Sequence, residues 1–194
     1  GQIFDFFAGE VLRLTGEVVP SVRPGVGVEI TREPVGVIGI ITPWNFPIAI
    51  PSWKIAPALA YGNTVVIKPA SPTPLSVRFV VDALTAAGVP AGVVNLVTGN
   101  GRAGDRLVRH PAVRKVAFTG STPAGRKIAA IAGEQLKRVT LELGGKSAAI
   151  VLPDADLEFA SDHLTAAAYG SAGERCMAIS VVVAVGSSAD PLVD

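Results

Sequence analysis

The feature that most restricts the fold of this 194-residue chain is a regular alternation of short apolar runs with longer helix-like stretches. Short runs rich in valine and isoleucine, bounded by glycine and proline, are typical of buried strands. Parallel strands need a crossover connection, usually a helix, so this order predicts an α/β fold with a doubly wound parallel sheet covered on both faces. The expected strands are residues 35–42, 64–68, 93–97, 113–119, 139–143, 148–152 and 179–185, and the expected helices are 52–61, 74–87, 104–109, 121–132 and 157–169.

The segment before the first expected strand breaks this order. Residues 18–21 and 25–30 are two strand-like runs on either side of a short turn, which predicts a β-hairpin that projects from the sheet. The helices carry the usual end signals: Gly88 is a C-terminal cap, and Ser121 or Thr122 is a suitable N-cap.

Composition agrees with a globular α/β fold and excludes some functions. Hydrophobic residues make up 49% of the chain and charged residues 17%, which is not the balance of a disordered protein. The length suits one domain, or one domain and a piece of another. The net charge of +1, without Lys/Arg clusters interleaved with aromatic residues, argues against nucleic-acid binding.

Cysteine content and apolar segments bear on location. A single cysteine excludes an internal disulfide framework, which suits a reducing compartment. Residues 1–7 lack the basic start and long apolar segment of a signal peptide. No apolar run reaches the roughly 18 residues of a membrane span. The sequence therefore predicts a soluble, cytoplasmic protein.

The one cysteine, Cys176, lies in a strip of small and polar residues at 171–178. A thiol becomes nucleophilic when it is partly exposed beside cations or backbone N–H donors, and Gly173 and Arg175 fit that description. Free cysteine is also among the most buried residue types, so a small buried hydrophobe is the alternative.

Two further polar residues occupy places that suit catalysis. Glu142 stands between two leucines and is followed by two glycines, which indicates a placed acid or base. Asn45 follows the apolar run 35–41 between two prolines, at the carboxyl end of a strand, where open α/β sheets bind ligands. A rigid amide donor there suits an oxyanion hole, and a turn asparagine is the alternative.

Nucleotide binding has to be argued from glycines. Residues 120–125 follow a strand and open a helix, so backbone N–H groups and the helix dipole could hold a pyrophosphate. This segment misses the P-loop pattern, because Arg126-Lys127 stands where Lys and Ser/Thr are needed, so an ATPase is not expected. The glycines at 99, 101 and 104 have the Rossmann spacing, but no acidic residue ends a strand about 20 positions later. Lys68, at the end of a strand, is a better-placed polar contact.

Five motifs occur together in order: Pro-Trp-Asn-Phe-Pro at 43–47, Lys-Pro-Ala at 68–70, Phe-Thr-Gly-Ser at 118–121, Leu-Glu-Leu-Gly-Gly-Lys at 141–146 and Gly-Glu-Arg-Cys at 173–176. In order and spacing they resemble the NAD(P)-dependent aldehyde dehydrogenase superfamily over nearly the whole chain. The resemblance implies that Cys176 attacks the aldehyde carbon, that Asn45 and the Cys176 backbone N–H hold the oxyanion, and that Glu142 activates the hydrolytic water. That superfamily's variant of the Rossmann fold does not need the usual fingerprint.

The resemblance also implies contacts to NAD or NADP. Lys68 would contact the adenosine ribose, Gly120 and Ser121 the pyrophosphate, and the Leu143 backbone the nicotinamide amide. Many NAD-specific relatives carry glutamate where this chain has Ser71, so NADP should be accepted. No metal is expected. The full set of expected cofactor residues is Ile41, Thr42, Pro43, Trp44, Lys68, Ser71, Gly101, Gly104, Phe118, Thr119, Gly120, Ser121, Gly125 and Leu143.

The same resemblance sets the expected organisation. Residues 1–145 would be a nucleotide-binding domain, with 16–32 as an oligomerisation hairpin, and 146–194 the start of a catalytic domain. Members of the family are much longer, which implies a fragment that is inactive alone and belongs to a homodimer or homotetramer in full-length form.

The favoured substrate is a semialdehyde, oxidised to the acid. The alternatives are a CoA-acylating semialdehyde dehydrogenase, whose subgroup lacks the glutamate kept here, and a catalytically incomplete nucleotide-binding fragment. Residues up to about 157 resemble succinate- and ketoglutarate-semialdehyde enzymes, whereas 166–180 resembles methylmalonate-semialdehyde dehydrogenase, so a recombinant chimera and a natural intermediate both stay open.

Overall fold

A computed structural model describes residues 1–193. The chain divides into two compact units: unit 1 is Gly1–Glu142, and unit 2 begins at Leu143. Each unit is described by itself. Among the described residues, none of the helices combines the length and the apolar character needed to cross a membrane.

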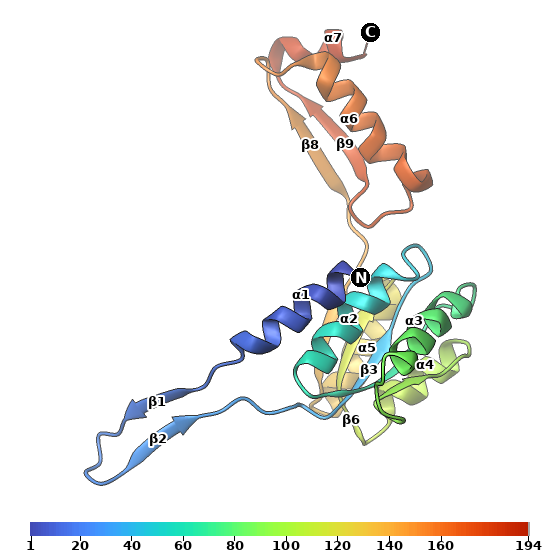
Figure 1. The fold of residues 1–194 in the computed structure, drawn as a ribbon. Helices are drawn as coiled ribbons and strands as arrows, with labels where there is room; N and C mark the ends of the chain where they lie inside the picture. The colour runs from blue at the N-terminus through green and yellow to red at the C-terminus, as the bar shows by residue number, and fades with distance from the viewer. Residues whose placement is uncertain (194) are drawn as a thin grey trace. The chain divides into compact units, whose positions relative to one another are not determined.

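Unit 1 is built on a five-stranded parallel sheet in the order β5-β4-β3-β6-β7. Figure 1 labels two of its strands, β3 and β6. Within this sheet the first strand in sequence is the central strand β3. The chain then adds β4 and β5 on one side of β3 and returns to add β6 and β7 on the other side. This reversal of direction is the defining property of a doubly wound sheet, so the predicted fold class is confirmed. The strands are β3 (Val37–Ile41), β4 (Thr64–Lys68), β5 (Val94–Leu96), β6 (Val113–Thr119) and β7 (Arg138–Glu142).

Helices cover both faces of this sheet. They are α2 (Ala49–Ala60), α3 (Pro74–Ala86), α4 (Gly101–Arg109) and α5 (Thr122–Glu134). Ile38 and Ile40 of β3 pack in one core with Ile55 of α2 and Val77 of α3. The residue between them, Gly39, faces the other way and lies against Leu107 of α4. Helix α5 packs beside α4, so α2 and α3 cover one face and α4 and α5 the other.

The core is built from β-branched residues on the central strands. Ile40 of β3, and Val65 and Ile67 of β4, are completely buried. Valine and isoleucine suit this position because their branched side chains pack well on a pleated surface that is buried on both sides.

The start of the chain forms α1 (Gln2–Glu10), a 3₁₀ turn (Val11–Arg13) and a hairpin of β1 (Glu17–Pro20) and β2 (Gly27–Ile30). The hairpin strands pair antiparallel, with Glu17 opposite Ile30 and Pro20 opposite Gly27. They form a sheet of their own, separate from the five-stranded sheet, as predicted (Figure 1). Helix α1 packs against α2.

Unit 2 is a single β-α-β arrangement. Strands β8 (Ser147–Val151) and β9 (Ile179–Ala184) pair in parallel and are connected through α6 (Leu157–Tyr169) and a 3₁₀ turn (Gly170–Gly173). A second 3₁₀ turn (Gly186–Ser188) and α7 (Ala189–Val193) follow. Of its described residues, Val151 and Ser188 alone are buried.

Several boundaries differ from those expected, most of them by one or two residues and the starts of two helices by three. Helix α2 begins at Ala49 instead of residue 52, because proline is tolerated in a first helical turn and Pro51 does not delay the start. Helix α4 begins at Gly101 instead of 104, because the Asn100 side chain caps it by accepting from Arg102 N at 3.0 Å. Strand β7 ends at Glu142, one residue before the expected end.

Candidate functional site

The carboxyl edge of the sheet in unit 1 collects most of the expected site residues in a row. The parallel register places Ile41 of β3 opposite Lys68 of β4 on one side and opposite Phe118 of β6 on the other. It also pairs Thr119 of β6 with Glu142 of β7. Each of these strands ends here, so residues far apart in the sequence reach one edge, where open α/β sheets bind ligands.

Glu142 is held by donors from two neighbouring elements. Lys54 of α2 donates from Nζ to Glu142 Oε2 at 2.9 Å, and Thr119 Oγ1 donates to the same oxygen. The Lys54 side chain is 6% exposed and that of Glu142 46%, so a buried ammonium group pairs with a half-exposed carboxylate.

The pKa of Glu142 follows from these contacts. Burial raises the pKa, but hydrogen bonds from Thr119 and Lys54, the charge of Lys54 and a hydrogen bond from Trp53 together lower it below its ordinary value. The carboxylate form is therefore favoured. Sequence reasoning missed Lys54 and Trp53, although a lysine between Trp53 and Ile55 on an otherwise apolar helix was a usable signal.

The loop after β3 carries Asn45 and its neighbours. Thr42 N donates to Lys68 O at 3.3 Å, which ties the start of the loop to the end of β4. Within residues 1–193, Thr42 Oγ1 is a buried hydroxyl that has no hydrogen-bond partner. Pro43 and Asn45 are half-buried and Trp44 is exposed. The loop therefore presents an indole ring and an amide beside the sheet edge.

Lys68 lies where β4 meets the start of α4. Its Nζ donates to Pro69 O at 2.8 Å, and burial lowers the pKa of the ammonium group. Gly104 lies against this side chain, since a Cβ there would be 3.7 Å from Lys68 Cδ and 3.6 Å from Ile41 Cδ1. Gly101 is the first residue of the same helix. Ser71 Oγ donates to Gly99 O at 3.4 Å, beside a cavity of about 250 Å³.

The turn from β6 into α5 contains the second glycine cluster. Gly120 N donates to Glu142 O at 3.1 Å, and a Cβ at Gly120 would lie 2.6 Å from Phe118 Cζ. Any side chain at Gly120 would therefore displace a buried ring. Ser121 occupies the N-cap of α5 but makes no side-chain capping bond, and Gly125 is buried in the first turns of that helix.

Cys176 belongs to unit 2 and is exposed, so the alternative of a buried hydrophobe is wrong. It follows a turn in which Ser171, Ala172 and Gly173 have φ values of 57°, 56° and 71°. Three consecutive left-handed residues are costly for the two that carry a Cβ. The carbonyl of Cys176 lies close to Gly145, where a Cβ would be 3.5 Å from it. Leu143, the first residue of this unit, is half-buried.

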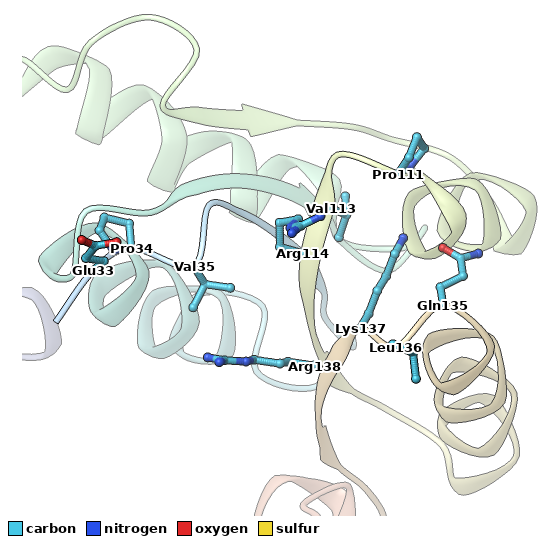
Figure 2. A pocket seen from close by; sticks show the side chains of 10 residues that line it. All are labelled: Glu33, Pro34, Val35, Pro111, Val113, Arg114, Gln135, Leu136, Lys137 and Arg138. Carbon is cyan, nitrogen blue, oxygen red and sulfur yellow. The ribbon is translucent and has the colours of Figure 1, made fainter.

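A further cavity, shown in Figure 2, lies where β3, β6 and β7 begin, at the amino edge of the sheet. None of the expected site residues lines it. Lys137 in its wall donates from Nζ to Val108 O at 2.6 Å and His110 O at 2.7 Å, and so binds the carbonyls at the end of α4. In the described part of the chain, no cluster of His, Cys, Asp and Glu could hold a metal ion.

Comparison with known proteins places this geometry in context. The sequence model of the aldehyde dehydrogenase family matches residues 1–194. The chain is 47% identical over 182 residues to α-ketoglutaric semialdehyde dehydrogenase of Bacillus subtilis (strain 168), covering 93% of this chain and 37% of the relative. It is 43% identical over 193 residues to malonate-semialdehyde dehydrogenase of Halalkalibacterium halodurans, covering 100% of this chain and 40% of the relative. The chain thus spans about two-fifths of the length of these relatives.

Solved structures give the same picture. PnpE in complex with nicotinamide adenine dinucleotide aligns with a TM-score of 0.94 and 44% identity, over 98% of this chain and 39% of that one. Succinate-semialdehyde dehydrogenase from Burkholderia pseudomallei aligns with a TM-score of 0.95 and 38% identity, over 99% of this chain and 40% of that one.

Proposed function

Because this chain belongs to the aldehyde dehydrogenase family, we propose that it carries the nucleophile, the general base and the cofactor edge of an NAD(P)-dependent aldehyde dehydrogenase. One observation carries the proposal: the register puts Ile41, Lys68 and Glu142 on one edge of a doubly wound sheet. The resemblance assigned these same residues to the cofactor and to water activation. The activity, substrate and partners proposed here are those of the whole protein.

Unit 1 has features that suit a dinucleotide. Thr42 offers a buried hydroxyl without a partner among residues 1–193. The bare backbone of Gly120 allows close approach, and the N-terminus of α5 directs N–H groups outward at the same turn. Lys68 supplies a cation at the next strand end. These residues would hold the pyrophosphate and ribose of NAD or NADP, which, when bound, accepts a hydride.

The chain's own residues would perform the remaining chemistry. The Cys176 thiolate would attack the aldehyde carbon, and Asn45 with the Cys176 N–H would bind the resulting oxyanion. After loss of the hydride the acyl group remains on sulfur as a thioester. Glu142, held as a carboxylate, would take a proton from the water that attacks this thioester, which releases the acid and the thiol.

A semialdehyde is the proposed substrate class, because relatives at 47% and 43% identity carry that word in their names. Water is the proposed acyl acceptor, because Glu142 is present and its contacts favour the carboxylate form. If CoA were the acceptor instead, product formation would depend on added CoA, so an assay with and without CoA separates the two.

We also propose that the hairpin at 16–32 is an oligomerisation arm of a homodimer or homotetramer in the cytoplasm. Val18 and Val22 on this hairpin are exposed, and both of its strands have unpaired edges. Light scattering on the complete protein, with Val18→Lys beside the unaltered hairpin, tests the arm: an unchanged mass would contradict it.

The test of the function uses the complete protein and two variants. Cys176→Ala should abolish aldehyde oxidation while NAD(P) still binds, and oxidation at a tenth or more of the unaltered rate would exclude the nucleophile role. Glu142→Gln should give a burst of NAD(P)H equal to the number of sites and then a slow steady state, because the thioester forms but hydrolyses slowly. Unchanged steady-state turnover would exclude Glu142 as the base.

Cofactor preference has its own test. A carboxylate in place of Ser71 would repel a 2′-phosphate by like charge, a cost on the order of a kcal/mol or more. Ser71→Glu should therefore shift kcat/KM toward NAD by roughly tenfold. Ser71→Ala is the matched control without the charge, and an unchanged ratio in Ser71→Glu would mean that Ser71 does not face the ribose.

A further inference from the structure

Thr119 occupies a position that serves two parts of the proposed site. It belongs to the Phe-Thr-Gly-Ser segment that the resemblance assigns to the cofactor. Yet its hydroxyl donates to Glu142 Oε2. Since the two residues are register partners on adjacent parallel strands, their side chains point to the same face of the sheet.

The same two residues are linked a second time through the backbone. Gly120, which follows Thr119, donates from its N–H to Glu142 O at 3.1 Å. Glu142 is thus held by its carboxylate from the last residue of β6 and by its carbonyl from the residue that follows. Thr119 itself is buried, at 8% exposure, so little of it is open to water.

Helix α2 supplies further donors to the same carboxylate. Lys54 donates to the same oxygen, Oε2, at 2.9 Å, and Trp53 adds a hydrogen bond to the carboxylate. Two donors on one oxygen, one of them charged, favour the ionised form and fix the direction of the side chain.

Other charged and titratable groups share the cavity of about 890 Å³ on which Glu142 opens. The cations are in excess over the anions there, which supports the ionised form of Glu142. The groups are Arg13, Arg32, Glu33, Lys54, Tyr61, Lys115 and Glu142.

We propose that Thr119 is a positioning residue for Glu142: its hydroxyl anchors the carboxylate by Oε2 on the α2 side of the sheet. This inference rests on the proposed function of Glu142 for its catalytic meaning, but not for the anchoring itself. The anchor depends on one group of the Thr119 side chain. A hydroxyl at residue 119 is required, and its methyl group is not.

The direct test is a carbon NMR titration of the Glu142 carboxyl group in the 194-residue chain, assigned with Glu142→Gln. Thr119→Val removes the hydroxyl and preserves the shape, so the pKa of Glu142 should rise above that of the unaltered chain. Thr119→Ser keeps the hydroxyl and should restore the original titration. Equal titrations of the unaltered chain and Thr119→Val would overturn the proposal, as would a Thr119→Ser titration that follows Thr119→Val.

A measurement on the unaltered chain covers the case in which Thr119→Val does not fold. A hydroxyl that donates to a carboxylate is protected from exchange, so the Thr119 hydroxyl proton should be observable while Glu142 is ionised and lost as Glu142 is protonated. A hydroxyl proton that shows no such dependence on pH contradicts the anchor.

Kinetics on the complete enzyme then separate the anchor from the proposed activity. In Thr119→Val the acid limb of thioester hydrolysis should move to higher pH, and Thr119→Ser should return it. If the NMR shift occurs and the acid limb stays, the anchor stands and the assignment of Glu142 as base fails. If neither occurs, the anchor itself fails.

Discussion

The two units of this chain have the same alternation of strands and helices along the sequence but differ in how much of their strands they bury. In unit 1 the central strands are enclosed, and Ile40, Val65 and Ile67 have no exposed surface. In unit 2 the valines of β9 remain exposed, with Val183 at 45%. Both units alternate strands with helices, yet the first forms a five-stranded sheet covered on both faces and the second a pair of strands.

This difference shows that the described residues hold the site side chains of unit 1 in place more firmly than those of unit 2. Glu142, Thr119 and Lys54 are held together by strands and a helix that share a closed core. Cys176 lies three residues after a turn of left-handed residues, in a unit that buries Val151 and Ser188 alone among its described residues. A pair of strands with little buried surface is only marginally stable, so unit 2 should open more readily than unit 1.

Hydrogen exchange should show the largest effect. Amides of β3 and β4 in unit 1 should exchange at least about 100-fold more slowly than amides of β9, because opening free energy follows local burial. Native-state exchange followed by NMR on the 194-residue chain measures both strands in one sample. Equal protection of β3 and β9 would remove the distinction between the units.

The second largest effect should be a difference in the free energy of unfolding between two matched substitutions. Val65→Ala deletes a completely buried side chain of β4 and should lower the free energy of unfolding by about 2 kcal/mol, since it loses transfer energy and leaves a cavity. Val183→Ala makes the same chemical change on β9 and should cost less than about 0.5 kcal/mol. Urea denaturation of both variants checks this, and similar losses would show that β9 is more enclosed than its exposure indicates.

The Lys54–Glu142 contact should make the stability of unit 1 depend on pH. The folded pKa of Glu142 lies below its ordinary value of 4.5, so its contribution is fully present above that value and is lost as pH falls through the folded pKa. Lys54→Met should reduce this acid-dependent loss of stability. The urea midpoint, measured between about pH 6 and pH 3, gives the slope for each protein.

The matched control is Arg78→Met, which removes an exposed pair with Asp82 on α3. Exposed pairs contribute little, so this variant should keep the acid-dependent slope of the unaltered chain. If Lys54→Met and Arg78→Met behave alike, the Glu142 contact adds nothing to unit 1.

Replacing left-handed residues with glycine should change the free energy of unfolding least. It compares the two units at one position each. Leu136 in unit 1 has φ 52° and is 95% exposed, and Ala172 in unit 2 has φ 56°. Glycine removes backbone strain of about 1 kcal/mol from the folded state. Part of this gain is lost, because glycine also raises the conformational entropy of the unfolded chain. Leu136→Gly and Ala172→Gly should each stabilise by less than about 0.5 kcal/mol in urea melts. Destabilisation by either change would mean that the lost side chain makes a favourable contact.

Much of the fold was predictable because it is encoded locally. The runs at Thr64–Lys68, Val113–Thr119 and Leu157–Tyr169 have the composition and period of their elements, and the structure forms them with the expected bounds. The starts that moved furthest, at α2 and α4, depended on a proline in a first turn and on an asparagine cap, which compete with the apolar pattern. The expected roles of the site residues stay predictions.

The sequence by itself determined the alternation of strands and helices and the hairpin, and it placed the carboxyl end of each strand to within one residue. Only the tertiary structure decided that Lys54 pairs with Glu142, 88 residues away, and that Thr119 donates to the same oxygen. The reason is physical: periodicity reports which face of one element is buried, whereas a contact between elements depends on the order of the strands in the sheet. That order, β5-β4-β3-β6-β7, places β6 beside β7 and α2 over the same face, and no local pattern contains it.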